Sequence, residues 1–354
     1  EQAAQGNKEQ LGEVAAAYAF LAQSQGDGQR LVEQSHKALA LLSEDNLTAR
    51  GIVSLNLGIA YWHMGRIPEA QEALEEAYPA ARQTGNTYAE MSARVFMGRT
   101  LAVRGLLHQA ATWFEELVHQ AGEMAVFPLV YLDLCTLHYE WDDLKAATYY
   151  LDKGVEASQQ IDNIEFQIGA YMLKVRVNTA RGDPTGAQDA LAQIHHLEHS
   201  NQIPVRTKAR SADLAVQLAL WQGDLQSAER LASQLVPNIE AHPFYRFLGL
   251  TPARLLLAQG QRERAGKQLQ LAAQAAQDND WGYGLVAALV LQALAAETDS
   301  LAQEFLGQAL TLAQPHGYIR AFTEAGQQLA PLLQEAIRRR SAPEYTEKIL
   351  ATLQ

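Results

Sequence analysis

Residues 195–199, which read His-His-Leu-Glu-His, are the part of the sequence whose residue types and spacing most resemble a metal site. They match the H-x-x-E-H pattern of one class of zinc hydrolases. On a helix, His195 and His199 lie on one face, where they could hold a metal ion beside Glu198. A catalytic zinc also needs a third protein ligand and a closed pocket, whereas the polar pair at 200–201 indicates an exposed helix end. The segment therefore favours a polar helix terminus over a metal hydrolase.

Residues 260–268, which read Gly-Gln-Arg-Glu-Arg-Ala-Gly-Lys-Gln, superficially resemble a phosphate-binding P-loop. Five residues separate the glycines where a P-loop has four, no Ser or Thr follows Lys267, and the context is helical. There is also no G-x-S-x-G motif, and nothing around Cys135 suggests a nucleophile. The sequence therefore predicts a protein that is not an enzyme and that needs no cofactor or metal.

A set of aromatic, histidine, arginine and aspartate residues recurs at matching places along the chain and is the better candidate for a binding surface. Aromatic faces with a few convergent polar groups are typical of small-molecule or sugar pockets, and arginines can clamp an anionic group. The candidate ligand-binding residues are Trp62, His63, Arg99, Tyr131, His138, Tyr139, Arg176, Asp213, Trp221 and Arg254. Two other interpretations stay open: the rings are core residues at helical spacing, and the arginine stems cover apolar surface.

A helical repeat must position these residues, because one pattern recurs with a period of roughly 36 to 41 residues. Its clearest copy is Leu57, Gly58, Tyr61, Gly65, Ala70, Leu74 and Ala77, and the next is Met97, Gly98, Leu101, Gly105, Ala110, Phe114 and Leu117. This is the spacing of the tetratricopeptide repeat (TPR), in which helix A and helix B form one unit. Gly58 should let the two helices approach closely, and Gly65 should end helix A with a positive φ.

Weaker copies extend the array in both directions. Turn glycines recur at Gly26, Gly182, Gly223 and Gly260, and two degenerate copies place Ala146/Tyr150 and Ala302/Leu306 on the same marks without the glycine. The sequence therefore predicts an all-α, TPR-like right-handed superhelix of about eight helical pairs. Its concave wall should come from helix A, at offsets −6, −3, +1, +4 and +5 from the small residue exemplified by Gly58. In the fourth repeat these offsets select Tyr131, His138 and Tyr139, and arginine stands at +1 as Arg99, Arg176 and Arg254.

The end of the chain departs from the repeat. We expect residues 1–314 to form the superhelical sensor domain and residues 315–354 to form capping helices that lead to a further domain. One helix is predicted around Leu329–Ile337 and another after Pro343. An array needs such an atypical element to cover its last hydrophobic face.

Residues 309–326, and above all the stretch Gly-Tyr-Ile-Arg-Ala-Phe-Thr-Glu-Ala-Gly at 317–326, resemble the end of the sensor region in MalT-like regulators. These are ATP-dependent, LuxR-type bacterial transcription activators of the STAND class. The resemblance implies a nucleotide-binding module before the superhelix, a helix-turn-helix domain after it, and an inducer that drives self-association. Because the chain starts at Glu1 without methionine, we expect a fragment of a longer protein. Since the sequence shows neither flanking module, we expect this fragment neither to hydrolyse ATP nor to bind DNA.

Composition agrees with this interpretation. The net charge of −12 disfavours a nucleic-acid surface, which needs a basic patch. The sequence has no run of about 18 apolar residues that could span a membrane. The single cysteine, Cys135, fits a reducing, cytoplasmic location.

The leading hypothesis is therefore a sensor whose concave face binds a small-molecule inducer or a regulatory protein and so controls self-association by a population shift. The main alternative is a stand-alone TPR adaptor that binds a peptide or protein and no small molecule. A metal hydrolase that uses His195, Glu198 and His199 is the second alternative.

Overall fold

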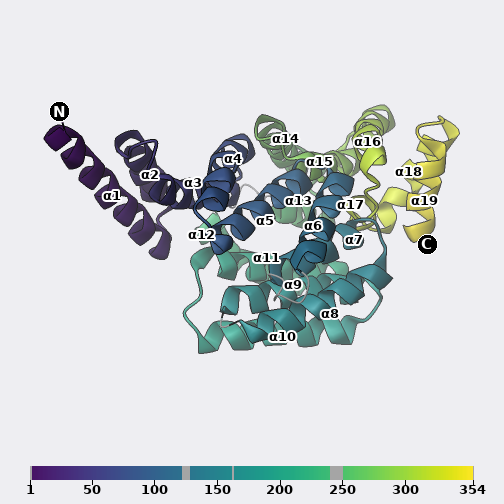
Figure 1. The fold of residues 1–354 in the computed structure, drawn as a ribbon. Coiled ribbons are helices and arrows are strands. Elements are labelled where there is room, and N and C mark those ends of the chain that lie inside the picture. Colours follow the sequence, from purple (N-terminus) through teal and green to yellow (C-terminus); the bar gives the residue numbers. More distant parts are fainter. Residues whose placement is uncertain (1, 122–127, 162, 240–249, 354) are drawn as a thin grey trace. The chain divides into compact units, whose positions relative to one another are not determined.

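The computed structural model describes residues 2–121, 128–161, 163–239 and 250–353, and these ranges contain helices but no β-strand (Figure 1). The first eight helices are α1 (Gln2–Ser24), α2 (Gly28–Leu41), α3 (Leu47–His63), α4 (Ile67–Gln83), α5 (Thr87–Val103), α6 (Leu107–Ala121), α7 (Pro128–Glu140) and α8 (Leu144–Gln160). The next eight are α9 (Ile164–Ala180), α10 (Pro184–Ser200), α11 (Val205–Trp221), α12 (Leu225–Ile239), α13 (Leu250–Ala258), α14 (Arg262–Asp278), α15 (Gly282–Ala295) and α16 (Asp299–Ala313). The chain then forms η2 (Gln314–His316), α17 (Arg320–Thr323), η3 (Gln327–Leu329), α18 (Ala330–Arg338) and α19 (Pro343–Leu353).

These elements confirm the predicted all-helical, TPR-like fold, since α1 to α16 alternate as helix A and helix B of successive repeats before the terminal helices. Among the described helices, none is both long and apolar enough to cross a membrane.

The second repeat shows how its glycines produce the pair. Gly65 has a φ of 73°, and the chain closes the end of α3 with hydrogen bonds from Gly65 N to Trp62 O and from Arg66 N to Tyr61 O. A Cβ placed on Gly58 would lie only 2.8 Å from Cγ of Leu74 in α4. Glycine therefore allows the close approach of α3 and α4 that the sequence predicts.

The fourth repeat departs from prediction by one residue. Its turn contains Asp142 instead of glycine, with a φ of 61°, a conformation that aspartate tolerates better than most residues. Counted from this turn, the buried helix-B positions are Ala147 and Leu151 rather than Ala146 and Tyr150, and Cys135 takes the small-residue position. The predicted register was therefore wrong here, because the sequence lacked the glycine that marks the turn.

The helices pack as two compact units, Glu1–Leu101 and Ala102–Gln354. In the first unit, Leu55, Leu74 and Phe96 belong to one buried cluster that joins α3, α4 and α5. In the second, α15 is enclosed on every side, because residues 286–295 are all buried.

The C-terminal segment reaches beyond the last repeat of the second unit. The amide of Ile319 donates a hydrogen bond of 2.8 Å to the carbonyl of Glu140 at the end of α7. The indole of Trp141 donates one of the same length to the carbonyl of His316. α17 consequently packs against α7 as well as α15 and α19, while α18 packs against α16. The segment therefore connects the eighth repeat with the fourth.

Gly282, the first residue of α15, is expected to tolerate no side chain. A Cβ there would lie 2.2 Å from the carbonyl oxygen of Arg104 and 3.1 Å from Cα of Gly105, and backbone atoms cannot move aside cheaply. Gly282→Ala should lower the free energy of unfolding by about 1–3 kcal/mol. Gly169→Ala is the matched control in α9, since a Cβ there meets nothing within 4 Å; it should be neutral or slightly stabilising. Equal midpoints for the two variants in urea unfolding would contradict the clash.

Candidate functional site

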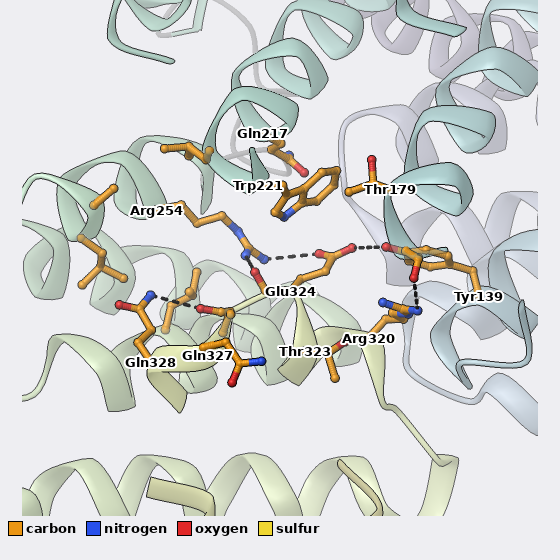
Figure 2. Close-up of a pocket in the computed structure, with 17 residues that line it drawn as sticks. Tyr139, Thr179, Gln217, Trp221, Arg254, Arg320, Thr323, Glu324, Gln327 and Gln328 are labelled. Atoms are coloured by element: carbon orange, nitrogen blue, oxygen red, sulfur yellow. Dashed lines mark hydrogen bonds and ion pairs between the residues drawn. The ribbon is translucent and has the colours of Figure 1, made fainter. Parts of the chain in front are cut away.

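A cavity of about 480 Å³ lies in the second unit, between the helices A of several repeats and the C-terminal segment (Figure 2). The repeats contribute Tyr139, Thr179, Ala180, Gln217, Leu220, Trp221, Arg254, Leu257, Ala258 and Leu291. The C-terminal segment contributes Arg320 and residues 323–328.

The repeat residues that line the cavity share one structural position. With the small residues at Cys135, Val175, Val216, Ala253 and Val290, every one of them stands at offset +1, +4 or +5 of its helix A. Offsets +4 and +5 are three and four residues after offset +1, about one helical turn, so both lie on the same face as +1. Three of the five offsets that the repeat pattern assigns to the inner surface therefore contribute to the lining of this cavity.

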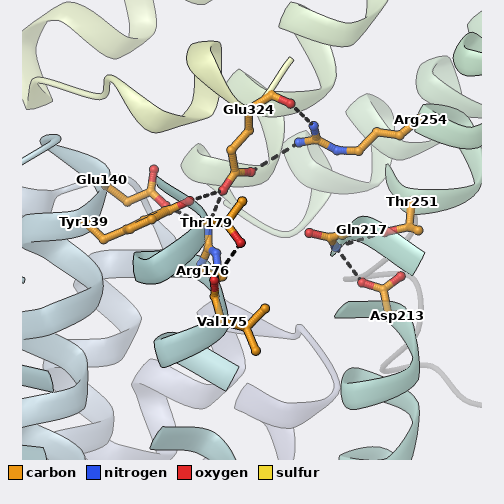
Figure 3. Close-up of polar contacts among 10 residues, drawn as sticks. All are labelled: Tyr139, Glu140, Val175, Arg176, Thr179, Asp213, Gln217, Thr251, Arg254 and Glu324. Atoms are coloured by element: carbon orange, nitrogen blue, oxygen red, sulfur yellow. Dashed lines mark hydrogen bonds and ion pairs between the residues drawn. The ribbon is translucent and has the colours of Figure 1, made fainter. Parts of the chain in front are cut away.

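Glu324 is the centre of the polar contacts at the cavity (Figure 3). Its Oε1 accepts hydrogen bonds from the Tyr139 hydroxyl at 2.8 Å and from Nη2 of Arg176 at 2.9 Å. Its Oε2 lies 3.5 Å from Nη2 of Arg254, and its carbonyl accepts a hydrogen bond from Nη1 of the same arginine at 3.0 Å. Two helix-A arginines at offset +1 therefore hold one carboxylate from the C-terminal segment.

Burial and charge set the ionisation of this cluster. Burial by itself would raise the pKa of Glu324, but the guanidinium groups of Arg176 and Arg254 outweigh it and hold the pKa below its usual value. Glu140 is only 3% exposed, and its Oε1 lies 3.3 Å from Nη2 of Arg176. Its Oε2 has no hydrogen-bond partner in the described structure. Burial therefore raises the pKa of Glu140 to about 7.

Arg320 forms the other side of the cluster. Its guanidinium pairs with Asp142 at 2.5 Å and lies 5.3 Å from the centre of the Tyr139 ring, which Arg176 also covers at 4.5 Å. Cation–π contacts of this kind hold the ring in place. The buried tyrosine thus joins α7, α9 and α17.

Asp213 lies one contact away from the cavity. Its Oδ2 accepts a hydrogen bond of 2.7 Å from Nε2 of Gln217, which also contacts the Thr251 hydroxyl at 3.0 Å (Figure 3). Burial raises the pKa of Asp213 to about 6. Asp213 therefore orients Gln217, which lines the cavity.

The structure brings together five of the ten candidate residues. Tyr139, Trp221 and Arg254 line the cavity, while Arg176 and Asp213 hold residues that line it.

His138 and Tyr131 are not among the lining residues. The His138 ring stacks on Tyr150 with 5.2 Å between ring centres and lies 3.3 Å from Asp143. The one-residue change of register accounts for this, because it puts Tyr139 at +4 and Glu140 at +5 in place of His138 and Tyr139.

Trp62, His63 and Arg99 belong to the first unit, where they form a cluster with Phe96. The Trp62 and Phe96 rings meet edge to face at 5.6 Å, and the Arg99 guanidinium lies over both rings at 5.6 and 5.2 Å. These contacts join α3 to α5. Trp62 and Arg99 therefore take part in helix packing, which stayed open as an alternative to ligand binding.

Glu140, Arg320 and Glu324 are three charged residues at this site that sequence reasoning missed. Arg320 and Glu324 stand in the most specific stretch of the sequence, 317–326, which was interpreted as a terminal cap. Two charged residues within a mostly apolar stretch were the available signal.

The two apparent chemical motifs have ordinary helical surroundings. Nδ1 of His199 lies 2.6 Å from the carbonyl of His195, Glu198 contacts the Ser211 hydroxyl, and α10 ends at residue 200. Lys267 pairs with Glu263 one turn earlier on α14 at 2.6 Å. In the part of the chain that the structure describes, no three His, Cys, Asp or Glu side chains converge as metal ligands.

Glu140 is expected to make the protein less stable as the pH rises from about 4.5 to about 7. In the folded state Glu140 keeps its proton up to about pH 7, whereas an unfolded glutamate releases it near 4.5. The folded state then binds more protons in this window, so the free energy of unfolding falls with rising pH. Each unit of pKa difference corresponds to about 1.4 kcal/mol. Glu140→Gln should remove part of that slope, which urea unfolding at several pH values across the window measures. The slope that remains should come from Asp213, whose pKa is also raised by burial.

The control for this prediction is Glu263→Gln, because Glu263 is exposed and Lys267 lowers its pKa instead of raising it. This variant should keep the wild-type slope between about pH 4.5 and 7. An unchanged slope in Glu140→Gln would mean that Glu140 is ionised in the folded protein.

Fold and site together define a TPR-type helical-repeat protein with a cavity on its helix-A surface. The family model of the MalT-like TPR region matches residues 12–339. The chain therefore belongs to the MalT-like TPR family. Among curated protein sequences, none matches the chain significantly.

Several solved structures are similar to this chain at low sequence identity. The apo form of the quorum sensor NprR from B. thuringiensis is 14% identical over 97% of this chain and 98% of its own, with a TM-score of 0.47. A STAND protein with a TPR sensor from Pyrococcus horikoshii is 15% identical over 98% of this chain and 54% of its own, with a TM-score of 0.49. A TPR protein from Parabacteroides merdae is 15% identical over 81% and 99%, with a TM-score of 0.47.

Proposed function

We propose that this chain is the sensor region of a MalT-like, LuxR-type transcription activator and that it binds a small-molecule effector in the cavity lined by Tyr139, Trp221, Arg254 and Glu324. The observation that carries the proposal is the composition of the wall: the repeats supply one part and the C-terminal segment the other. Family membership supports the sensor role. The chain acts by binding, in the cytoplasm, without catalysis or a cofactor.

The cavity has the chemistry of a ligand site. Leu220, Leu257 and Leu291 offer apolar contact, and Trp221 adds an aromatic surface. Gln217, Gln327 and the arginines supply directional polar groups, which is the usual division of labour in small-molecule pockets. The charged side chains are already paired with each other, so they are held in position before a ligand arrives.

Both the repeats and the C-terminal segment line the cavity, which suggests how ligand binding is transmitted to the C-terminal helices. A ligand that touches both α11 or α13 and residues 323–328 stabilises the arrangement in which Glu324 is held by Arg176 and Arg254. A ligand shifts a conformational equilibrium only by its difference in affinity for the two states. Because α18 and α19 follow directly, the effector controls the presentation of the C-terminal helices and, through them, self-association and transcription.

A thermal-shift screen tests the proposal, with sugars, aromatic carboxylic acids and nucleotides as probes at about 1 mM. A compound that stabilises the wild type should lose at least about tenfold in affinity, or about 1.4 kcal/mol, with Trp221→Ala. Tyr149→Ala is the control, since Tyr149 is an exposed aromatic of the same unit that does not line the cavity. Equal stabilisation of wild type and Trp221→Ala would show that the compound binds elsewhere.

The alternative of a TPR adaptor makes a different prediction. A peptide or protein partner would protect the helix-A surface from hydrogen exchange while every small molecule leaves the midpoint unchanged. That combined result would favour a polypeptide partner over a small-molecule effector as the ligand of this surface.

A further inference from the structure

Gln217 lines the cavity with an amide group whose orientation is fixed. Its Nε2 donates hydrogen bonds to Oδ2 of Asp213 at 2.7 Å and to the Thr251 hydroxyl at 3.0 Å. A carboxylate oxygen only accepts hydrogen bonds, so the amide nitrogen must face Asp213 and the amide oxygen must face the other way. Figure 3 shows this oxygen directed away from both partners. Gln217 therefore presents a hydrogen-bond acceptor to the cavity.

Three further lining residues present oxygen in the same way. Nε2 of Gln327 and Nε2 of Gln328 each donate to a backbone carbonyl of the C-terminal segment. The Thr179 hydroxyl donates to the carbonyl of Val175 at 2.8 Å. Within the described ranges, no group donates to the amide oxygens of the three glutamines or to Oγ1 of Thr179. A ligand can therefore use these oxygens as acceptors.

The charged donors at the cavity are already engaged inside the protein. Both terminal nitrogens of Arg254 and the Tyr139 hydroxyl contact Glu324. The guanidinium of Arg320 pairs with Asp142. An anionic ligand would have to displace one of these carboxylates and leave it without its partner, which is costly in a buried site.

The side of the cavity next to α11 combines negative charge with an aromatic ring. Burial raises the pKa of Asp213 to about 6, so its carboxyl group is ionised at neutral pH. The hydrogen bond to this carboxylate polarises the Gln217 amide and makes its oxygen a stronger acceptor. Trp221 stands four residues after Gln217 and lies on the same face of the helix. The amide oxygen and the indole therefore meet a ligand from the same side.

We propose that the effector of this cavity is a protonated primary amine with an apolar body, an inference that rests on the function proposed above because it names the ligand class of the same cavity. The ammonium group donates to the oxygens of Gln217 and Thr179, and the face of Trp221 adds a cation–π contact. The apolar body lies against Leu257 and Leu291. A primary ammonium has three N–H donors and no acceptor, which matches a wall of acceptors.

An uncharged alcohol matches this wall less well. A hydroxyl donates one hydrogen bond and gains neither the attraction of the Asp213 charge nor the cation–π contact with Trp221. Charge-assisted hydrogen bonds are also about twice as strong as those between neutral groups. The cavity should therefore prefer an amine to an alcohol of the same shape.

Three probes of similar shape test the class of the head group: phenethylamine, phenethyl alcohol and phenylpropionate. Isothermal titration at neutral pH and constant ionic strength measures their affinities for the full chain. The amine should bind at least about tenfold more tightly than the other two. An alcohol or a carboxylate that binds as tightly as the amine would overturn the proposal, as would an amine that does not bind at about 1 mM.

Gln217→Met tests the acceptor, because methionine keeps the length of the side chain and removes the amide. It should weaken amine binding at least about tenfold. Gln274→Met is the matched control and should leave the affinity unchanged. Gln274 also donates to an aspartate one turn away, Asp278, at 2.8 Å, but it is exposed on α14 and is not among the lining residues.

Thr179→Val is a second variant that keeps the shape of the side chain and carries the test if Gln217→Met does not fold. It should weaken amine binding about threefold, since it removes one acceptor. An amine affinity that neither Gln217→Met nor Thr179→Val changes would contradict the proposed contacts.

Trp221→Ala separates this proposal from the proposed function. If the alcohol or the carboxylate binds more tightly than the amine and Trp221→Ala weakens it, the cavity is an effector site for another class of compound. The amine is then wrong and the proposed function stands. If the amine binds Trp221→Ala as tightly as the wild type, it binds outside the cavity, and the ligand class proposed here is wrong.

Discussion

Arg176→Met is expected to lower the free energy of unfolding by about 3 kcal/mol, because it removes the guanidinium nearest to the buried Glu324 carboxylate. Arg176 is the cation shared by Glu324 at 2.9 Å and Glu140 at 3.3 Å, and both carboxylates are at most 6% exposed. Methionine retains most of the aliphatic stem, so the loss reports on charge more than on packing. Urea unfolding followed by circular dichroism measures the change.

Two further variants separate charge from structure. Glu324→Gln on the Arg176→Met background should recover part of the lost stability, since it removes a buried carboxylate that has lost its nearest guanidinium partner. Arg338→Met should have no measurable effect, because Arg338 is 70% exposed and pairs with Glu335 on its own helix. Arg176→Met with wild-type stability would show that Arg254 alone compensates the Glu324 carboxylate.

Phe322→Ala is expected to have an effect of similar size and to release the C-terminal segment. Phe322 is fully buried in α17 and meets the Tyr345 ring of α19 edge to face at 6.2 Å. Truncation of a buried phenylalanine costs about 3–5 kcal/mol, because a cavity replaces its contacts. Hydrogen exchange should show the loss first at the Ile319 amide, which donates to the Glu140 carbonyl.

The same variant connects the segment to the proposed effector site. If residues 323–328 form part of the wall, Phe322→Ala should also weaken the binding of any compound found in the thermal-shift screen. Leu312→Ala is the control, because Leu312 is 44% exposed on α16. Slow exchange at Ile319 in Phe322→Ala would mean that the ionic contacts of Glu324 hold the segment without Phe322.

The regular part of the fold was predictable because its causes are local. Glycines such as Gly65 and Gly58 act within one helical pair, by ending a helix or by allowing the next one to approach, so their spacing reveals the repeat. The offsets of helix A follow from the same period, and they identified Tyr139, Trp221 and Arg254 as residues of one surface. Where Asp142 replaced the glycine, the local signal failed and the register moved by one residue.

The sequence alone thus determined the helical pairs, the turns and the face of helix A that looks inward, because each depends on residues within one or two repeats. Only the tertiary structure decided what that face contacts. Arg176 and Glu324 are 148 residues apart, and nothing in a nearest-neighbour repeat pattern specifies which distant segment returns to which helix. Arg176 and Arg254 were candidates for contact with an external ligand. In the folded chain both hold a carboxylate of its own C-terminal segment, since a buried guanidinium requires an anionic partner.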